Sequence, residues 1–266
     1  MKGLDFVAVV YNNYLDTLDF CKSVEINRKS FDKINCYLID NSDDEFIINK
    51  IHEIAEEFEF VKVLRPPKNL GYFGGFNYFF KSEFFNSKND VLLCNNDLIF
   101  HDDFVLKYLS SSYDDDVLVV CPDVITIDGY HQNPHVKNRM GIFWKLKLDI
   151  YYLNYNLASM LVFLKKLLKF KRKFNIDESC YIHMGIGACY ILNEKFFRNF
   201  DFLEYPHFLY GEEAYFSNQV YKMGGRMYFH NDLKVQHKES ATLSKLPSRI
   251  TYNFAKAGYR NYRKYL

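Results

Sequence analysis

The sequence predicts an α/β fold in which helices cover both faces of a mainly parallel sheet. Through the first half of the chain, short apolar segments alternate with amphipathic segments of helical spacing. The apolar segments are continuous rather than interrupted by polar residues, which is typical of strands buried on both faces. Turn-forming or glycine-rich residues follow them, as expected where a strand ends.

The elements are expected in the following order. Strands are predicted at 4–12, 34–42, 59–66 and 90–97, and helices at 14–27, 45–58 and 76–86. The segment 145–173 differs, because its many Lys and Arg residues stand among aromatic and aliphatic ones, with Asp149 as the only acid. Further on, compact apolar signals return at 185–197. A helix is predicted at 212–223, a strand at 225–231 or 233–238, and a basic, aromatic helix at 252–266.

The composition favours one domain in the cytoplasm. The net charge of +1 over 266 residues gives no global attraction to nucleic acid. The six cysteines form no CxxC pair and are expected to be reduced core residues. The first residues lack the layout of a signal peptide. No uncharged apolar stretch reaches the ~18 residues that a spanning helix needs, so we expect no membrane span.

Polar groups follow the predicted strands at Asn12, 40–42, 69–77 and 95–97. Ligands bind beyond the carboxyl ends of the strands in sheets of this kind, so these groups predict a ligand site. Asp97 directly follows an apolar strand, where a carboxylate can hold Mg²⁺ or Mn²⁺ against a diphosphate. The alternative is a simple turn, since Asn and Asp are favoured in turns.

The stretch "NLGYFGGFN" at 69–77 places three glycines ahead of a predicted helix. Glycine allows a ligand to approach the backbone closely, and the free amides at a helix start suit an anion. The stretch matches neither the Walker pattern nor the dinucleotide fingerprint. A turn without a ligand is the alternative.

Glu212 and Glu213 begin the predicted helix of "YGEEAYFSNQVYKMGG". Glu213 lies three residues before Phe216 and so shares the apolar face that points into the protein, whereas Glu212 aligns with Gln219. An inward carboxylate beside a ligand cleft is a candidate general base. Capping is the alternative, because acids in a first turn complement the helix dipole.

Taken together and in this order, the motifs resemble the family 2 glycosyltransferases, specifically the rhamnosyltransferase-like branch with a GT-A (Rossmann-like) fold. The resemblance covers about residues 5–110 and 180–262. It is carried by "VAVVYNN", "YLIDNSDD", "NLGYFGGFN", "LLCNNDLIF", "GIGACYILNEKFF", "FLYGEEAYFSNQVYKMGGRMYF" and "VQHKESA". The last of these contains His237, which closes a predicted strand.

The resemblance implies a metal-dependent, inverting transferase that uses a nucleotide-diphosphate sugar. Asp97 and His237 would hold Mn²⁺ or Mg²⁺, and Glu213 would fall on the catalytic base. The donor nucleotide would be bound by Tyr11, Asn12, Asp40, Asn69, Gly71, Gly74, Gly75, Asn77, Asn95 and Asn96. The implied halves are 1–110 for the nucleotide sugar and 111–240 for the acceptor. A basic, aromatic helical insertion is expected at 142–175 and a basic, aromatic C-terminal helix at 241–266.

The sequence departs from the family pattern at three positions. Asn95 stands where an Asp is usual, and Tyr215 replaces a further acid. The helix reads EE where the family usually has ED, which leaves open whether Glu212 or Glu213 is the base.

The resemblance also implies partners and a place in the cell. Donors would be dTDP-rhamnose or a UDP-hexose, and the acceptor a saccharide, lipid-linked in many family members, in bacterial cell-surface polysaccharide synthesis. Segment 145–173 fits contact with an anionic membrane at its inner face, with a lid or a solvated basic face as alternatives. Two other functions stay open, a sugar nucleotidyltransferase and a non-catalytic nucleotide-sugar-binding domain.

Overall fold

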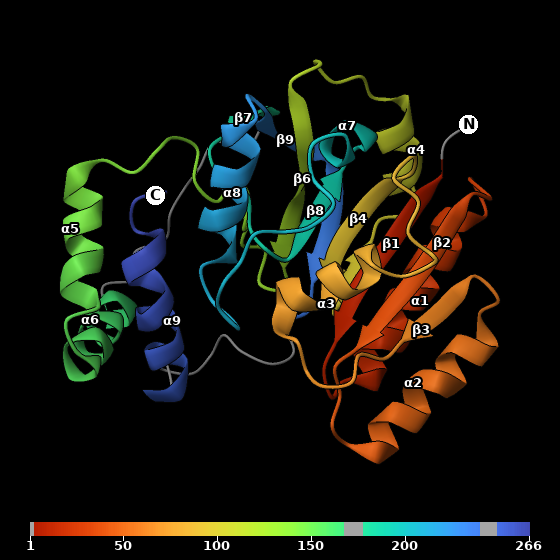
Figure 1. The fold of residues 1–266 in the computed structure, drawn as a ribbon, viewed down its shortest axis with the longest axis horizontal. Helices are drawn as coiled ribbons and strands as arrows, with labels where there is room; N and C mark the ends of the chain where they lie inside the picture. Colours follow the sequence, from red (N-terminus) through yellow and green to blue (C-terminus); the bar gives the residue numbers. More distant parts are fainter. Residues whose placement is uncertain (1–2, 168–177, 240–248) are drawn as a thin grey trace.

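The four apolar segments of the first half form neighbouring parallel strands of a nine-stranded sheet (Figure 1). The computed structural model describes residues 3–167, 178–239 and 249–266. The parallel strands are β1 (Leu4–Val10), β2 (Ile34–Asp40), β3 (Val61–Leu64) and β4 (Asp90–Asn95). They lie in the order β3-β2-β1-β4, which confirms the predicted α/β class.

The second half of the sheet is mixed. Its strands are β5 (Leu98–Phe100), β6 (Val117–Thr126), β7 (Cys180–Ile182), β8 (Cys189–Leu192) and β9 (Arg226–His237). The full order is β3-β2-β1-β4-β8-β6-β9-β5, with β7 also paired to β9. Strand β8 is antiparallel to both of its neighbours, whereas β6 and β9 are parallel. The parallel arrangement therefore holds for β1 to β4 and for the β6–β9 pair.

Helices cover both faces of the sheet, as predicted. One apolar cluster joins α1 (Tyr14–Arg28), α2 (Glu45–Glu57) and α4 (Phe104–Ser110) to one face. A second cluster joins α3 (Gly71–Phe80), α7 (Glu194–Phe197) and α8 (Glu212–Lys222) to the other face. The alternation along β1 shows the division, because Phe6 belongs to the first cluster and Val7 to the second.

Three helices stand beside the sheet rather than on it (Figure 1). These are α5 (Ile142–Tyr151), α6 (Tyr155–Leu167) and α9 (Arg249–Tyr262). The helices predicted for the insertion and the tail are thus present, while 168–175 and 241–248 lie outside the described residues. Helix α9 stacks on the α5 side through Tyr259 and Tyr152, whose ring centroids are 4.4 Å apart. Within the described ranges, no helix has the length and apolar character needed to cross a bilayer.

Helix α3 begins at Gly71, earlier than the predicted start at residue 76, and ends at Phe80. The prediction treated all three glycines as loop residues. Gly71 has φ +73°, where glycine is favoured, but Gly75 lies inside the helix. A Cβ at Gly75 would come within 2.9 Å of the Val9 side chain, so this glycine lets the helix pack closely on β1.

The two segments that were alternatives for the last strand form one strand, β9. It follows β6 in parallel and changes register between Pro122 and Asp123. Its final residue, His237, pairs with Leu98 of β5. This register places His237 beside Asp97, at the edge of the sheet where β1 and β4 end.

Candidate active site

A pocket of about 890 Å³ lies at the carboxyl ends of β1, β2 and β4. Parallel pairing sets Val9 of β1 opposite Asn95 of β4, so the residues that follow these strands meet at one edge. The lining consists of Val9, Tyr11, Asn12, Asn13, Leu15, Asp16, Asn41, Asn69, Gly71, Tyr72, Asn95, Asn96, Asp97, Phe208, Leu209, His237 and Glu239. This is the location predicted from the fold class.

Asp97 and His237 face each other in this pocket. Asp97 Oδ1 lies 3.2 Å from His237 Nε2. The oxygen is nonetheless buried without a hydrogen-bond partner among the described residues. Distance alone would suggest an ion pair, but the angular geometry is not that of a hydrogen bond. An orphaned carboxylate oxygen beside an imidazole nitrogen is the arrangement expected of two ligands that converge on a cation.

A chain of hydrogen bonds fixes the orientation of the His237 ring. His237 Nδ1 lies 2.8 Å from Gln132 Oε1, and Gln132 Nε2 donates to Glu239 Oε1 at 2.7 Å. Because a carboxylate only accepts, the Gln132 amide turns its NH₂ to Glu239 and its oxygen to the ring. Nδ1 therefore carries a ring proton and donates it to Gln132, and Nε2 is the ring nitrogen that faces Asp97.

The pair Asp97–His237 fits a divalent cation whose remaining ligands are not protein side chains. Across 3–167, 178–239 and 249–266, no group of three or more His, Cys, Asp or Glu side chains gathers as a metal site. A site with only two protein ligands suits Mg²⁺ or Mn²⁺, which commonly complete their coordination with phosphate oxygens and water. The carboxylate and the imidazole are both suitable donors for Mn²⁺.

Asn12 is fixed at the mouth of the pocket by the segment that follows β2. Its Nδ2 donates to Asp43 Oδ1 at 2.6 Å, and its backbone N–H donates to Ser42 Oγ at 2.9 Å. The Tyr11 hydroxyl also donates to Asp43, at 3.2 Å, while the ring stays half exposed. An exposed ring at this position is available for stacking on a planar ligand.

Asp40 lies next to the pocket rather than on its lining. Its buried carboxylate accepts from Arg65 Nη1 at 2.8 Å and from the backbone N–H of Ser42 at 2.9 Å. It lines a neighbouring pocket of about 540 Å³, which shares Asn41 and Asn69 with the larger one. Asn41 joins the two, because its side chain donates to Gly71 O and accepts from Leu70 N.

The predicted donor-binding loop divides into residues that reach the pocket and residues that do not. Asn69 and Gly71 line it, and a Cβ at Gly71 would overlap the Phe208 carbonyl. Gly74 and Gly75 lie within α3, away from the lining. Asn77 instead exchanges hydrogen bonds with the Leu203 backbone, at 3.0 and 2.7 Å.

The Asn-rich end of β4 reaches the pocket throughout. Asn95, Asn96 and Asp97 all contribute to the lining. Asn96 also ties β4 to the start of α1, because its Nδ2 donates to Asn13 O and to Thr17 Oγ1.

Glu212 is the more buried of the two glutamates, contrary to the predicted orientation. Its exposed fraction is 7%, whereas Glu213 is intermediate. The face that Glu212 shares with Gln219 is covered by the segment before α8, since Gln219 hydrogen-bonds Phe202 O and Glu204 N. Burial raises the pKa of Glu212 to about 8, with the charge of Glu213 as a second cause.

Tyr72 connects the glutamates to the pocket, whose lining includes neither of them. Its hydroxyl donates to Gly187 O at 2.7 Å. A Cβ at Gly187 would lie 3.0 Å from Glu213 Oε1, so the absence of a side chain there leaves room for that carboxylate. Burial raises the pKa of Tyr72 well above its usual value, and the charges of Glu212 and Asp97 add to the effect. Tyr72 therefore lines the pocket and also reaches Gly187, the residue beside Glu213.

Several contributing residues have no signal in the sequence. Gln132 and Glu239 are single polar residues in loops, and Phe208 reaches the pocket from the segment before α8. Asp16 could have been noticed, because it lies in the first turn of a helix that starts at the predicted site. It accepts from Lys238 Nζ at 3.1 Å, which links α1 to the residue after His237.

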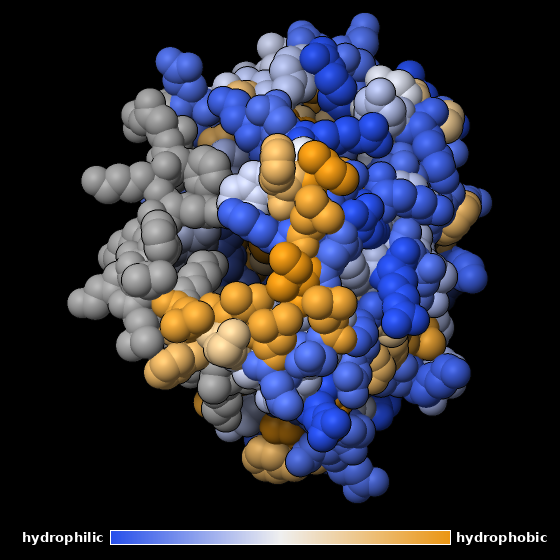
Figure 2. Space-filling view, turned by 90° about the vertical axis from the view of Figure 1, so that its left-hand side faces the viewer, coloured by the Kyte–Doolittle hydropathy of each residue, from blue (hydrophilic) through white to orange (hydrophobic). Residues whose placement is uncertain are grey.

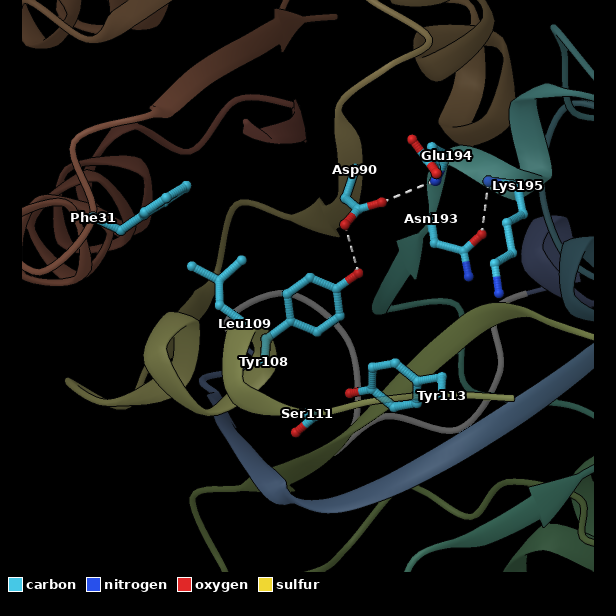
Figure 3. A pocket seen from close by; sticks show the side chains of 9 residues that line it. All are labelled: Phe31, Asp90, Tyr108, Leu109, Ser111, Tyr113, Asn193, Glu194 and Lys195. Carbon is cyan, nitrogen blue, oxygen red and sulfur yellow. Dashed lines mark hydrogen bonds between the residues drawn. The ribbon is translucent and has the colours of Figure 1, made fainter. Parts of the chain in front are cut away.

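A second pocket, of about 620 Å³, lies at the opposite end of β4 (Figure 3). Both carboxylate oxygens of Asp90 are used there. One accepts from the Tyr108 hydroxyl and the other from the Glu194 backbone N–H, each at 2.9 Å (Figure 3). These bonds attach α4 and α7 to the start of β4, so we assign the cluster a structural role.

Comparison with known proteins agrees with this geometry. The family model for glycosyl transferase family 2 matches residues 5–197. No curated protein matches the chain. A structure of GalNAc-T7 with UDP, GalNAc and Mn²⁺ aligns with a TM-score of 0.64 at 16% identity, covering 98% of this chain and 48% of that one. The mannosyltransferase PcManGT from Pyrobaculum calidifontis, in complex with GDP-Man and Mn²⁺, aligns with a TM-score of 0.55 at 12% identity, covering 98% of this chain and 60% of that one. The chain thus spans about half to three fifths of the length of these neighbours, and the likeness concerns the fold.

The Gln132 bridge generates a prediction about metal affinity. Gln132→Leu removes the acceptor that holds the Nδ1 proton of His237, so we expect affinity for Mn²⁺ to fall by about 10- to 100-fold. Titration of Mn²⁺ followed by electron paramagnetic resonance measures this. The matched control is Gln236→Leu, at an exposed position on β9, the strand that ends at His237. Equal affinities in both variants would show that the bridge does not orient the ring.

The raised pKa of Glu212 predicts a pH dependence of stability. The folded chain keeps the Glu212 proton up to a pKa of about 8, whereas the ordinary value is 4.5. Between these values unfolding releases a proton, so the free energy of unfolding falls as pH rises, by at most ~1.4 kcal/mol per pH unit. Urea unfolding from pH 5 to 8 should show this slope in the wild type and lose it in Glu212→Gln. Glu59→Gln, at an exposed glutamate, is the control. Parallel curves for wild type and Glu212→Gln would contradict the prediction.

Proposed function

The chain belongs to glycosyl transferase family 2 and is a glycosyltransferase, and we propose that it transfers a sugar from a nucleotide-diphosphate donor to a saccharide acceptor with inversion. The observation that carries the proposal is that Asp97 and His237 face each other. The Asp97 oxygen nearest to His237 is buried and has no hydrogen-bond partner among the described residues. The neighbours with UDP and with GDP-Man support a donor of this class. The family match also disfavours the two alternatives, a sugar nucleotidyltransferase and a non-catalytic binding domain.

In this proposal the donor lies in the 890 Å³ pocket. Tyr11 and Asn12 contact the nucleoside, and Asn69 and Gly71 border it from the α3 side. Asp97 and His237 hold Mn²⁺ or Mg²⁺ against the diphosphate. A cation held by these two residues would offset the negative charge that gathers on the leaving diphosphate.

We assign the general base to Glu213. The pKa of Glu212 is raised to about 8, so Glu212 keeps its proton near neutral pH and is a poor acceptor. Glu213 lies on the same turn of α8, with its carboxylate against Gly187. A difference in burial between two neighbouring acids is a common basis for dividing catalytic roles. Glu213 then takes the proton of the acceptor hydroxyl, which attacks the anomeric carbon in one displacement, so no enzyme nucleophile is needed.

The finer substrate assignment follows the family resemblance. The donor is dTDP-rhamnose or a UDP-hexose, and the acceptor is a lipid-linked saccharide. The reaction then extends a bacterial cell-surface polysaccharide at the cytoplasmic face of the membrane. The branch within the family is rhamnosyltransferase-like, as the loop at 69–77 and the helix at 210–225 suggest.

Donor binding is tested by thermal unfolding with a panel of nucleotide sugars, with and without Mn²⁺. A true donor at about 100 times its Kd should add ~2.7 kcal/mol to the free energy of unfolding, because it binds only the folded chain. We expect the increment to need Mn²⁺ and to be reduced in Asp97→Asn. A donor that stabilises both proteins equally without Mn²⁺ would remove Asp97 from diphosphate binding. Failure of the whole panel would reject these donors.

The base assignment is tested by two matched substitutions. Glu213→Gln removes the proton acceptor, so kcat should fall by roughly 10²- to 10⁴-fold while the thermal shift caused by the donor persists. Glu212→Gln replaces a neutral acid by a neutral amide of similar size, so kcat at pH 7 should stay within about tenfold of wild type. The transfer assay uses the donor found above and Mn²⁺. The reverse pattern would make Glu212 the base.

A further inference from the structure

Helix α5 turns its acid, beside Leu148, toward the protein and an apolar row toward the outside. Its only acid, Asp149, points to α9, where it accepts from Arg263 Nε and Nη2 at 2.6 Å and from the Tyr259 hydroxyl at 2.6 Å. The Arg263 hydrogen bond lowers the pKa of Asp149 to about 2, so the carboxylate is charged at neutral pH. A surface helix normally has the opposite arrangement, with its charges toward water.

The outward face of α5 is an apolar stripe. Phe143, Leu146 and Ile150 follow one another at helical spacing, and their exposed fractions are 78%, 47% and 48%. No residue of α5 is buried. On the side of the molecule where α5 and α6 lie, Figure 2 shows hydrophobic residues gathered in a continuous band. Monomeric proteins rarely expose contiguous apolar patches of this kind unless they bind something.

The apolar surface continues beyond α5. Leu153, in the turn between α5 and α6, and Met160, Phe163 and Leu164 of α6 are exposed. Helix α9 adds Ile250 and Phe254. Phe254 contacts Phe208, with ring centroids 6.2 Å apart, and Phe208 lines the donor pocket. The exposed apolar residues of the three helices therefore connect to the rim of the active site.

The charges on this surface favour a lipid bilayer over a second copy of the chain. Lys147 is exposed, and its ammonium lies 4.4 Å from the centre of the Trp144 ring. The positive charge therefore lies next to an exposed aromatic side chain. Lys145 lies on the inner side of the helix, one turn before Asp149, and is only partly exposed. The one acid of the two helices, Asp149, is turned away to Arg263. A two-fold contact between copies would bring like charges together, whereas anionic headgroups complement them.

We propose that the exposed side chains of α5 and α6 form a docking surface for an anionic bilayer. The apolar stripe enters the boundary between headgroups and acyl chains, and Lys147 meets the lipid phosphates. Docking sets the rim of the donor pocket beside the lipid surface, where a lipid-linked acceptor would present its sugar. That last consequence rests on the proposed function, but the docking itself does not.

The test is co-sedimentation of the full chain with vesicles of phosphatidylcholine, alone or with phosphatidylglycerol. We expect binding to the anionic vesicles that weakens with added salt. Phe143→Ser should lower the partition coefficient by about tenfold, because it removes a large apolar side chain from the bilayer. Replacing Lys147 with Gln should lower it by roughly fivefold on anionic vesicles only.

Phe46→Ser is the matched control, since Phe46 is an exposed phenylalanine on α2 at the far side of the sheet (Figure 1). It should bind vesicles as the wild type does. Failure of the wild type to sediment, or equal losses in Phe143→Ser and Phe46→Ser, would overturn the proposal. A dimer detected by light scattering that Phe143→Ser abolishes, without vesicle binding, would assign the surface to a second copy. No donor is present in these assays, so the thermal shift caused by nucleotide sugars judges the proposed function separately.

Discussion

The pairing of β5 with β9 is the contact on which the site depends. Asp97 comes from the first half of the chain and His237 from the end of β9, and only the register of Leu98 with His237 brings them together. Two further contacts hold this edge. Lys238 N–H donates to Asp97 O at 3.0 Å, and the Lys238 ammonium pairs with Asp16 and Asp19 of α1. The Asp97–His237 pair is therefore built into strand geometry rather than left to loop conformation.

The neighbouring glutamates of α8 illustrate how one helix turn produces two different acids. Both belong to the first turn, where the helix dipole favours negative charge. Burial overrides this for Glu212, whose pKa rises to about 8, although the backbone amides of residues 210 to 212 act in the opposite direction. Desolvation thus has the largest effect on the pKa of Glu212. Glu213 is less buried than Glu212.

Much of the fold could be predicted from the sequence. The part of the site that lies at the ends of strands could be predicted as well. The continuous apolar runs of β1 to β4 are distinctive, so the edge that joins Asn12, Asn95 and Asp97 could be predicted. The roles of the glycines could not, because a glycine that turns the chain and one that packs on a strand look the same in sequence. The burial of Glu212 depends on the segment before α8, whose hydrogen bonds to Gln219 leave no periodic signal. Gln132 and Glu239 act through single long-range contacts, which one sequence cannot reveal.

The contact between α8 and α9 has an evolutionary consequence. Gly211, at φ +103°, precedes the two glutamates, and a Cβ there would overlap the Tyr262 ring. Gly258 is similarly confined, since a Cβ would lie 2.9 Å from Tyr210 O. Positions 211 and 262 therefore share one volume, and natural homologues should vary them jointly. A homologue that carries a side chain at 211 should have a smaller residue at 262, or a differently placed last helix, and also a backbone at 211 without the positive φ.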